Sequence, residues 1–294
     1  MDQLFPLEQD YLAQLLAGSE SCAPTLRAWL DKTDLAVGWM KDSEGGLAAT
    51  LAGLGAGKVI LRSPMDSDHA SFHQVDRYCE TVSTVAGGRL DEKRLRLPDA
   101  LLHVAAESVV GAGVGNGQAI VVLHPGSGSP HKCCGHGLFV KLIEQVRAWG
   151  ALPVLLAGPA DMERVRAIQD SFADPPVALE GFELIAVAGL LAQAALYIGH
   201  DSGITHLAAC LHVPTIALFG PTDPQRWAPR GRHVEVVSGA PCVCRDWHSV
   251  QACTEKPCLK VPAEPVLAAC TARLQDWAKS RIEARGAVPL PCHV

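Results

Sequence analysis

The stretch that decides the fold of this chain is residues 195–211, which read ALYIGHDSGITHLAACL. An apolar, strand-like run over 195–198 leads into the polar turn Gly-His-Asp-Ser-Gly, and an apolar, helix-like run over 207–211 follows. Asp201 and Ser202 are both residue types that cap helices, and the glycine after them leaves backbone N–H groups free to meet a phosphate. The sequence therefore predicts a strand, a short loop and a helix whose N-terminus suits an anion.

A second segment of the same kind lies at 124–132 and reads HPGSGSPHK. It follows a predicted strand over 119–123 and precedes a predicted helix over 138–149. Strands alternate with helices through this half of the chain, which predicts a parallel sheet covered by helices on both faces. Ligands of such sheets bind at the carboxyl ends of the strands, where both loops fall. Lys132 in one loop and Asp201 in the other favour a phosphate-bearing ligand with a polyhydroxylated end.

The composition indicates a folded protein that does not bind nucleic acid. Of the 294 residues, 48% are apolar and 19% are charged, which supports a sizeable core and argues against wholesale disorder. The formal net charge of −6 argues against nucleic acid as the main partner. No run approaches the ~18 apolar residues of a membrane span, and the chain start lacks the pattern of a signal peptide. We therefore expect a soluble cytoplasmic protein.

A glycine-dense segment at 111–117, GAGVGNG, predicts a linker between two domains. Residues 1–117 form the predicted N-terminal domain, which opens with a predicted helical stretch over 7–31. Residues 118–264 form the predicted C-terminal domain and contain both marked loops. A last segment, 265–294, is mainly helical.

Eleven cysteines in a cytoplasmic protein indicate reduced thiols rather than a disulfide framework. Four of them cluster in the sequence: Cys242, Cys244, Cys253 and Cys258. Four thiolates from two short loops can close a tetrahedron around zinc, although the C-x-C spacing is tighter than the usual C-x₂-C. Two interpretations stay open, a structural zinc knuckle and unligated or pairing thiols.

Three sequence blocks together resemble glycosyltransferase family 9, the ADP-heptose:lipopolysaccharide heptosyltransferases. They are 124–132, 199–209 (GHDSGITHLAA) and 213–223 (VPTIALFGPTD), and they occur in the family's order. The resemblance implies an α/β protein of GT-B architecture, with two Rossmann-like domains facing each other across a cleft. The nucleotide sugar would be held mainly by the C-terminal domain, and the final helix, within 265–294, would cross back to the N-terminal domain.

The resemblance assigns roles to residues of both loops. Lys132 matches the family's lysine that contacts the donor, and its ammonium would stabilise charge developing on the leaving diphosphate. Asp201 matches the aspartate that accepts hydrogen bonds from the donor sugar, so Lys132 and Asp201 are the predicted catalytic residues. The predicted donor-binding residues are Gly126, Ser127, Ser129, Lys132, Asp201, Ser202, Gly203 and His206. Thr222 and Asp223 are further candidates at the same rim, and neither a metal ligand nor a cofactor is expected there.

The implied activity is an inverting, metal-independent transfer of a heptose or related sugar from an ADP-type nucleotide sugar to a lipopolysaccharide core or similar glycan. The implied partners are this donor, this acceptor and, because the acceptor is lipid-linked, the inner-membrane surface as a peripheral contact. Some members of the family hold the ribose with a glutamate after the next strand. In this chain the candidate is Asp161, Glu163 or neither.

The N-terminal domain departs from the family's pattern. Members begin with a strand and a Gly-Asp loop whose aspartate is the proposed general base, and residues 1–33 do not match them, so this domain is expected to be incomplete. The replacement candidates for the base are Asp66, Asp68, His69 and His73. Alternatively a partner chain supplies the missing half. A third hypothesis is a catalytically weak or inactive subunit that binds a nucleotide sugar.

Overall fold

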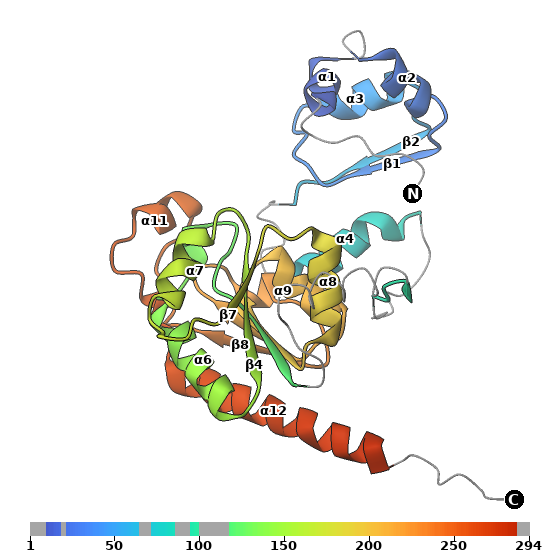
Figure 1. Cartoon of the computed structure of the whole chain (residues 1–294). Helices are drawn as coiled ribbons and strands as arrows, with labels where there is room; N and C mark the ends of the chain where they lie inside the picture. Colours follow the sequence, from blue (N-terminus) through green and yellow to red (C-terminus); the bar gives the residue numbers. More distant parts are fainter. Residues whose placement is uncertain (1–9, 19–21, 65–71, 86–94, 100–117, 287–294) are drawn as a thin grey trace, which may run out of the picture. The chain divides into compact units, whose positions relative to one another are not determined.

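The computed structural model describes residues 10–18, 22–64, 72–85, 95–99 and 118–286 and divides the chain into two compact units, 1–91 and 92–294 (Figure 1). This division, between residues 91 and 92, lies ahead of the predicted boundary at 117. Residues just after 91 already contact the second unit. Leu95 N donates a hydrogen bond to Cys210 O (2.8 Å), and Leu97 packs against that unit's core. The predicted linker at 111–117 lies outside the described residues.

The first unit contains a two-stranded parallel sheet with helices. Strand β1 (Leu35–Gly38) pairs with β2 (Lys58–Leu61). The helices are α1 (Tyr11–Ala17), α2 (Pro24–Leu30), α3 (Gly46–Gly53) and α4 (Gln74–Ser83). Leucines of α2 and α3 form the buried core of this unit together with Cys22, Leu54 and Ala56.

The predicted helical stretch over 7–31 contains two helices, α1 and α2, with a break between them. Gly18 follows α1 with a φ of 104°, a conformation that favours glycine and ends the helix. Pro24 then opens α2 at its first position, where its missing N–H costs no hydrogen bond. The sequence carried both signals, a glycine that stops one helix and a proline that starts the next.

The second unit is built on a six-stranded parallel sheet, which confirms the predicted α/β class. Its strands are β3 (Ile120–His124), β4 (Leu152–Ala157), β5 (Val177–Glu180), β6 (Leu196–His200), β7 (Thr215–Phe219) and β8 (Val234–Ser238). They lie in the order β5-β4-β3-β6-β7-β8. This is the strand order of a dinucleotide-binding fold, and its direction of progression reverses between β3 and β6.

Helices cover both faces of this sheet (Figure 1). On one face lie α6 (Gly137–Ala148), α7 (Met162–Gln169) and α12 (Ala263–Gly286), and on the other lie α8 (Leu184–Gln193) and α9 (Gly203–Cys210). Buried residues alternate between the two cores: Val121 and Leu123 join the first, whereas Ile120 and Val122 join the second. This alternation is the period of a strand buried on both faces.

The final helix α12 packs within the second unit. Val266, Cys270 and Leu274 belong to the core that α6 shares, and Gln145 Nε2 donates a hydrogen bond to Leu267 O (2.7 Å). A crossing of this helix to the first unit stays a prediction. In the described part of the chain, no helix is long and apolar enough to cross a membrane.

Candidate functional site

The two marked loops lie next to each other because their strands are neighbours. β3 pairs with β6, and His124 at the end of β3 lies opposite Gly199. The chain leaves both strands at their carboxyl ends, so the loops over 125–129 and 201–203 start side by side. Ser127 Oγ joins them by donating a hydrogen bond to Asp201 O (2.8 Å). This position is the reversal point of the sheet, where ligands of such folds bind.

Lys132 and Asp201, the predicted catalytic pair, form an ion pair. Lys132 Nζ donates to Asp201 Oδ2 at 2.8 Å, and the side chains are 25% and 9% exposed. Thr222 Oγ1, from the loop after β7, donates to the same oxygen at 2.8 Å. An ammonium has three N–H donors, so this contact leaves two of them for other oxygens. The arrangement places a cation and a carboxylate next to each other at the carboxyl end of the central strands.

Ser202, rather than Asp201, caps helix α9. Ser202 Oγ accepts a hydrogen bond from Thr205 N (3.4 Å), and the Asp201 carboxylate points instead to Lys132 and Thr222. This confirms the expectation that the serine can serve as the cap. The aspartate is therefore available for a role other than ending the helix.

A cavity of about 690 Å³ opens beside this pair, within the second unit. Both glycine loops and the start of α9 contribute to its wall. Of the predicted donor-binding residues, those that line it are Ser127, Ser202, Gly203 and His206. Gly128 and Asp161 line it as well, whereas Gly126, Ser129, Lys132 and Asp201 do not. Most of the remaining wall is apolar, as in Leu156, Phe182 and Val187, which suits one flat face of a ligand.

Asp161 lies directly behind the glycine loop. Its Oδ2 accepts a hydrogen bond from Gly158 N (3.1 Å) and lies 3.2 Å from His124 Nε2. Burial raises the pKa of this carboxyl, but His124, through its hydrogen bond and charge, and backbone hydrogen bonds from Gly158 and Ser127 together outweigh it, so the pKa of Asp161 stays below its usual range. A Cβ on Gly126 would lie 1.9 Å from Asp161 Oδ1, so only glycine fits there. Glu163, the other ribose candidate, is exposed on α7.

A buried polar network behind the site was missed by the sequence analysis. Tyr197 OH lies 3.4 Å from His124 Nδ1 and 3.0 Å from Thr205 Oγ1. Thr205 Oγ1 donates in turn to His200 O. Burial is the main reason that the pKa of the Tyr197 hydroxyl is raised. The network links the ends of β3 and β6 to the first turn of α9, and the only signal for it was polar residues within otherwise apolar runs.

The buried ring of His200 contacts the backbone of the glycine loop and of Cys134. Its Nδ1 lies 3.3 Å from Gly126 O, and its Nε2 accepts a hydrogen bond from Cys134 N (2.9 Å). A carbonyl oxygen only accepts, so Nδ1 carries the ring proton. Burial, followed by the charge of Arg164, lowers the pKa of His200 to about 3, and the ring is therefore neutral. Arg164 Nη1 also contacts the backbone of Cys134, because it donates a hydrogen bond to Cys134 O (2.7 Å).

The structure describes one of the four candidates for the general base. Asp66, Asp68 and His69 lie outside the described residues. His73 is the N-cap of α4, and its Nδ1 accepts a hydrogen bond from Val75 N (3.2 Å). Asp223, which does not line the cavity, caps the short helix α10 (Pro224–Trp227) by accepting from Gln225 N (2.9 Å).

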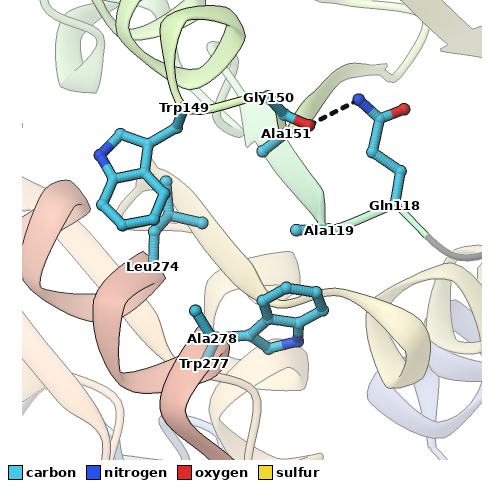
Figure 2. Close-up of a pocket in the computed structure, with 8 residues that line it drawn as sticks. All are labelled: Gln118, Ala119, Trp149, Gly150, Ala151, Leu274, Trp277 and Ala278. Atoms are coloured by element: carbon cyan, nitrogen blue, oxygen red, sulfur yellow. Dashed lines mark hydrogen bonds between the residues drawn. The ribbon is translucent and has the colours of Figure 1, made fainter. Parts of the chain in front are cut away.

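A second cavity, of about 540 Å³, lies at the opposite, amino end of the same sheet (Figure 2). Trp149 comes from the end of α6 and Trp277 from α12, and Gln118 Nε2 donates to Gly150 O at 2.7 Å. No residue that lines this cavity is titratable. It therefore offers no group for acid–base or charge-stabilising chemistry.

A model of glycosyltransferase family 9 (heptosyltransferase) matches residues 43–256 of this chain. Lipopolysaccharide heptosyltransferase 3 of Escherichia coli is 38% identical over 119 residues, which are 39% of this chain and 35% of that protein. Lipopolysaccharide heptosyltransferase 1 of Pseudomonas aeruginosa is 29% identical over 217 residues, 68% of this chain and 57% of that protein. The chain thus spans between about a third and somewhat over half of the length of these curated relatives.

Two solved structures share the fold. The family 9 glycosyltransferase of Veillonella parvula matches with a TM-score of 0.74 and 20% identity, over 89% of this chain and 79% of that one. The ADP-heptose lipopolysaccharide heptosyltransferase II of E. coli matches with a TM-score of 0.66 and 18% identity, over 86% and 80%. These likenesses confirm the predicted GT-B fold class with Rossmann-like domains.

Proposed function

This chain belongs to glycosyltransferase family 9, the heptosyltransferases, and we propose that it transfers a heptose or related sugar from an ADP-type nucleotide sugar to a lipopolysaccharide core or similar glycan. The names of its relatives, lipopolysaccharide heptosyltransferases 1 and 3, support this donor and acceptor class. They do not favour the alternative, a nucleotide-sugar-binding subunit without transferase activity. We place the reaction in the cytoplasm, with peripheral contact to the inner membrane that carries the acceptor.

The observation that carries the proposal is the Lys132–Asp201 pair at the reversal point of the sheet. We propose that Lys132 keeps one N–H on Asp201 and directs the others to oxygens of the donor's diphosphate. Negative charge grows on that diphosphate as the bond to the sugar breaks. An ammonium already in place stabilises this charge without reorganisation, and it supplies the cation in a metal-independent transfer.

Asp201 is the proposed partner of the donor sugar. Its Oδ2 is occupied by Lys132 and Thr222, and Oδ1 has no donor among the residues that the structure describes. We assign Oδ1 to a sugar hydroxyl. Hydrogen bonds from sugar hydroxyls to a carboxylate strengthen as the ring gains positive charge in the transition state, which favours the rate.

The cavity beside the pair is the proposed seat of the nucleotide. Backbone N–H groups at the start of α9, in Ser202 and Gly203, point to the diphosphate with the positive end of the helix dipole behind them. Ser127 lines the same cavity, although its hydroxyl already donates to Asp201 O, and Ser129 does not line it. Between the two ribose candidates we favour Asp161, because it lines the cavity and Glu163 does not.

The proposed transfer is a single displacement with inversion. The acceptor hydroxyl attacks the anomeric carbon on the face opposite the diphosphate, the bond to the diphosphate breaks, and ADP leaves with the electron pair. A base takes the proton of the attacking hydroxyl. His73 is a weak candidate for this base, because its Nδ1 already accepts a backbone hydrogen bond.

Calorimetric titration of ADP and ADP-heptose into the protein tests this site. We expect Lys132→Ala and Asp201→Ala to weaken binding about 10- to 100-fold, as for a lost hydrogen bond to a charged group. Lys141→Ala and Asp170→Ala, at exposed positions, are matched controls that keep full affinity. Magnesium should change none of these affinities. If both site variants bind as tightly as the controls, the assignment is wrong.

A further inference from the structure

A loop rich in cysteine follows the last strand of the sheet, at residues 239–260. It contains α11 (Trp247–Ala252) and the short 3₁₀ turn η5 (Pro257–Leu259). The sulfur atoms of Cys242, Cys244 and Cys253 all lie within 4.8 Å of one another. Cys258 is not within that mutual distance of all three, but its thiol interacts with the Cys242 thiol, so a fourth sulfur lies beside the group.

The spacing of these sulfurs fits one ion rather than bonded pairs. A zinc–sulfur bond of about 2.3 Å in a tetrahedron places neighbouring sulfurs about 3.8 Å apart. A disulfide would require sulfurs at about 2.05 Å, and all four cysteines are free thiols. Three mutually close sulfurs with a fourth beside them match the donor set of a closed structural site.

The backbone around the cluster is folded to bring the sulfurs together. Lys256 adopts a left-handed conformation (φ 41°, ψ 54°), and its backbone N–H donates to Cys253 Sγ at 3.3 Å. Gly239 lets the chain pass η5, since a Cβ there would lie 2.3 Å from Cys258 O.

We propose that Cys242, Cys244, Cys253 and Cys258 bind one metal ion in a tetrahedral site, and that this ion is zinc. Four thiolates select zinc or iron among the common metals, and a site closed by four protein ligands is structural. Each thiol that binds the ion loses its proton to solvent. The site lies outside the proposed transfer chemistry.

The metal would hold a loop that supports the donor site. Lys256 Nζ donates a hydrogen bond to His131 Nδ1 (3.0 Å). The rings of Trp247 and His131 form an edge-to-face contact with their centroids 6.3 Å apart. His131 is the neighbour of Lys132. On the other side, Leu259 packs against Gly220, two residues before Thr222. The loop therefore contacts the segment before Lys132 and the segment before Thr222, and these two residues donate hydrogen bonds to Asp201.

Metal analysis of the full-length protein, purified under reducing conditions without chelator, tests the proposal. We expect about one zinc per chain. Cys242→Ser and Cys253→Ser should each lower the metal content about tenfold, since a closed site loses affinity with a ligand. Cys22→Ser is the matched control, because that thiol lies in the first unit and donates to Gly18 O. It should keep the full metal load.

A cobalt-substituted protein answers the same question if a serine variant does not fold. Tetrahedral cobalt bound by four thiolates gives intense sulfur-to-cobalt charge-transfer bands, and their appearance would support the site. Their absence, a metal-free protein after reconstitution, or a full load in Cys253→Ser would each overturn the proposal. Iron in place of zinc would overturn the identity of the ion.

Removal of the metal has a second expected effect. With the ion displaced by a mercurial reagent, we expect faster proteolytic cleavage within 239–260 than elsewhere in the second unit. Unchanged cleavage would overturn the role of the ion in ordering the loop. Metal content does not depend on Lys132, so this outcome is distinct from that of the nucleotide titration.

Discussion

The carboxyl and amino ends of the six-stranded sheet differ sharply although they share the same strands and the same two cores. At the carboxyl end, a cavity adjoins the Lys132–Asp201 ion pair and the buried network around Tyr197. At the amino end, a second cavity is lined by two tryptophans, Gln118, Leu274 and small residues (Figure 2). Charged residues line the first of these cavities, and none lines the second.

The difference comes from what the chain does after each strand. At the carboxyl ends it turns through glycines into helix N-termini, where free N–H groups attract anions. At the amino ends, helices finish in turns, such as Gly150 with its φ of 74°, and apolar side chains fill the space. Cavity volume alone therefore does not identify a functional site in such a fold.

The largest expected effect at the carboxyl end is that of Gly126→Ala. The new Cβ would overlap the Asp161 carboxylate, which His124 and Gly158 N hold in place. We expect a loss of about 3 kcal/mol, measured by urea unfolding of the second unit. Gly128→Ala is the control, because nothing lies within 4 Å of its Cβ.

Adding Asp161→Ala to Gly126→Ala should recover part of that loss, since the overlap then disappears. Equal stability of the Gly126→Ala and Gly128→Ala variants would show that the loop can move away from Asp161. The carboxyl end would then be no more tightly built than the amino end.

An intermediate effect is expected from His200, through pH. Its folded pKa of about 3 lies below the unfolded value of about 6.5, so protons bind the unfolded state first as pH falls. Stability is full above pH ~6.5 and is lost progressively as pH falls towards the folded value; the loss reaches about 2 kcal/mol at pH ~5.

Thermal melting between pH 7 and 5 checks this expectation. His200→Gln should flatten the dependence on pH, because glutamine can both donate to Gly126 O and accept from Cys134 N without titrating. His233→Gln, at an exposed position, should leave the slope as it is. A wild-type slope in His200→Gln would mean that other groups cause the acid loss.

The smallest effect is expected at the amino end. Gln118→Ala removes the hydrogen bond to Gly150 O, which lies in solvent, so the change in stability should stay within ~0.5 kcal/mol. Calorimetry should show unchanged ADP affinity. A clear loss of affinity would mean that the two ends of the sheet are coupled and would remove the contrast between them.

Sequence patterns predicted the central strands and the loops between them well, and the edge strands poorly. β3, β6 and β7 are fully buried and read as continuous apolar runs. β5 (VALE) and β8 (VEVVS) were not predicted, because each is half-exposed at an edge and mixes apolar with polar residues. Such short, mixed segments look like loops until a neighbouring strand binds them.

The candidate site was also predicted only in part, because sequence patterns mark its loop residues but not its buried contacts. Lys132, Asp201 and Ser202 stand in loops with recognisable glycine and capping patterns. Tyr197, Thr205 and His124 lie in the quoted stretches, but their contacts with one another were missed, since a polar residue in an apolar run gives no sign of its partner. His200 was noticed only as part of a motif, and its anchoring of Gly126 depends on burial that no local pattern reports.

The sequence by itself determined the strand–loop–helix units and the family blocks, because these depend on neighbours along the chain. Only the tertiary structure decided that Lys132 and Asp201, separated by 69 positions, meet at 2.8 Å. That meeting requires β6 to pair with β3 rather than with β5, which precedes it. Strand pairing at such a distance is set by the packing of helices on both faces of the sheet, and no local propensity encodes it.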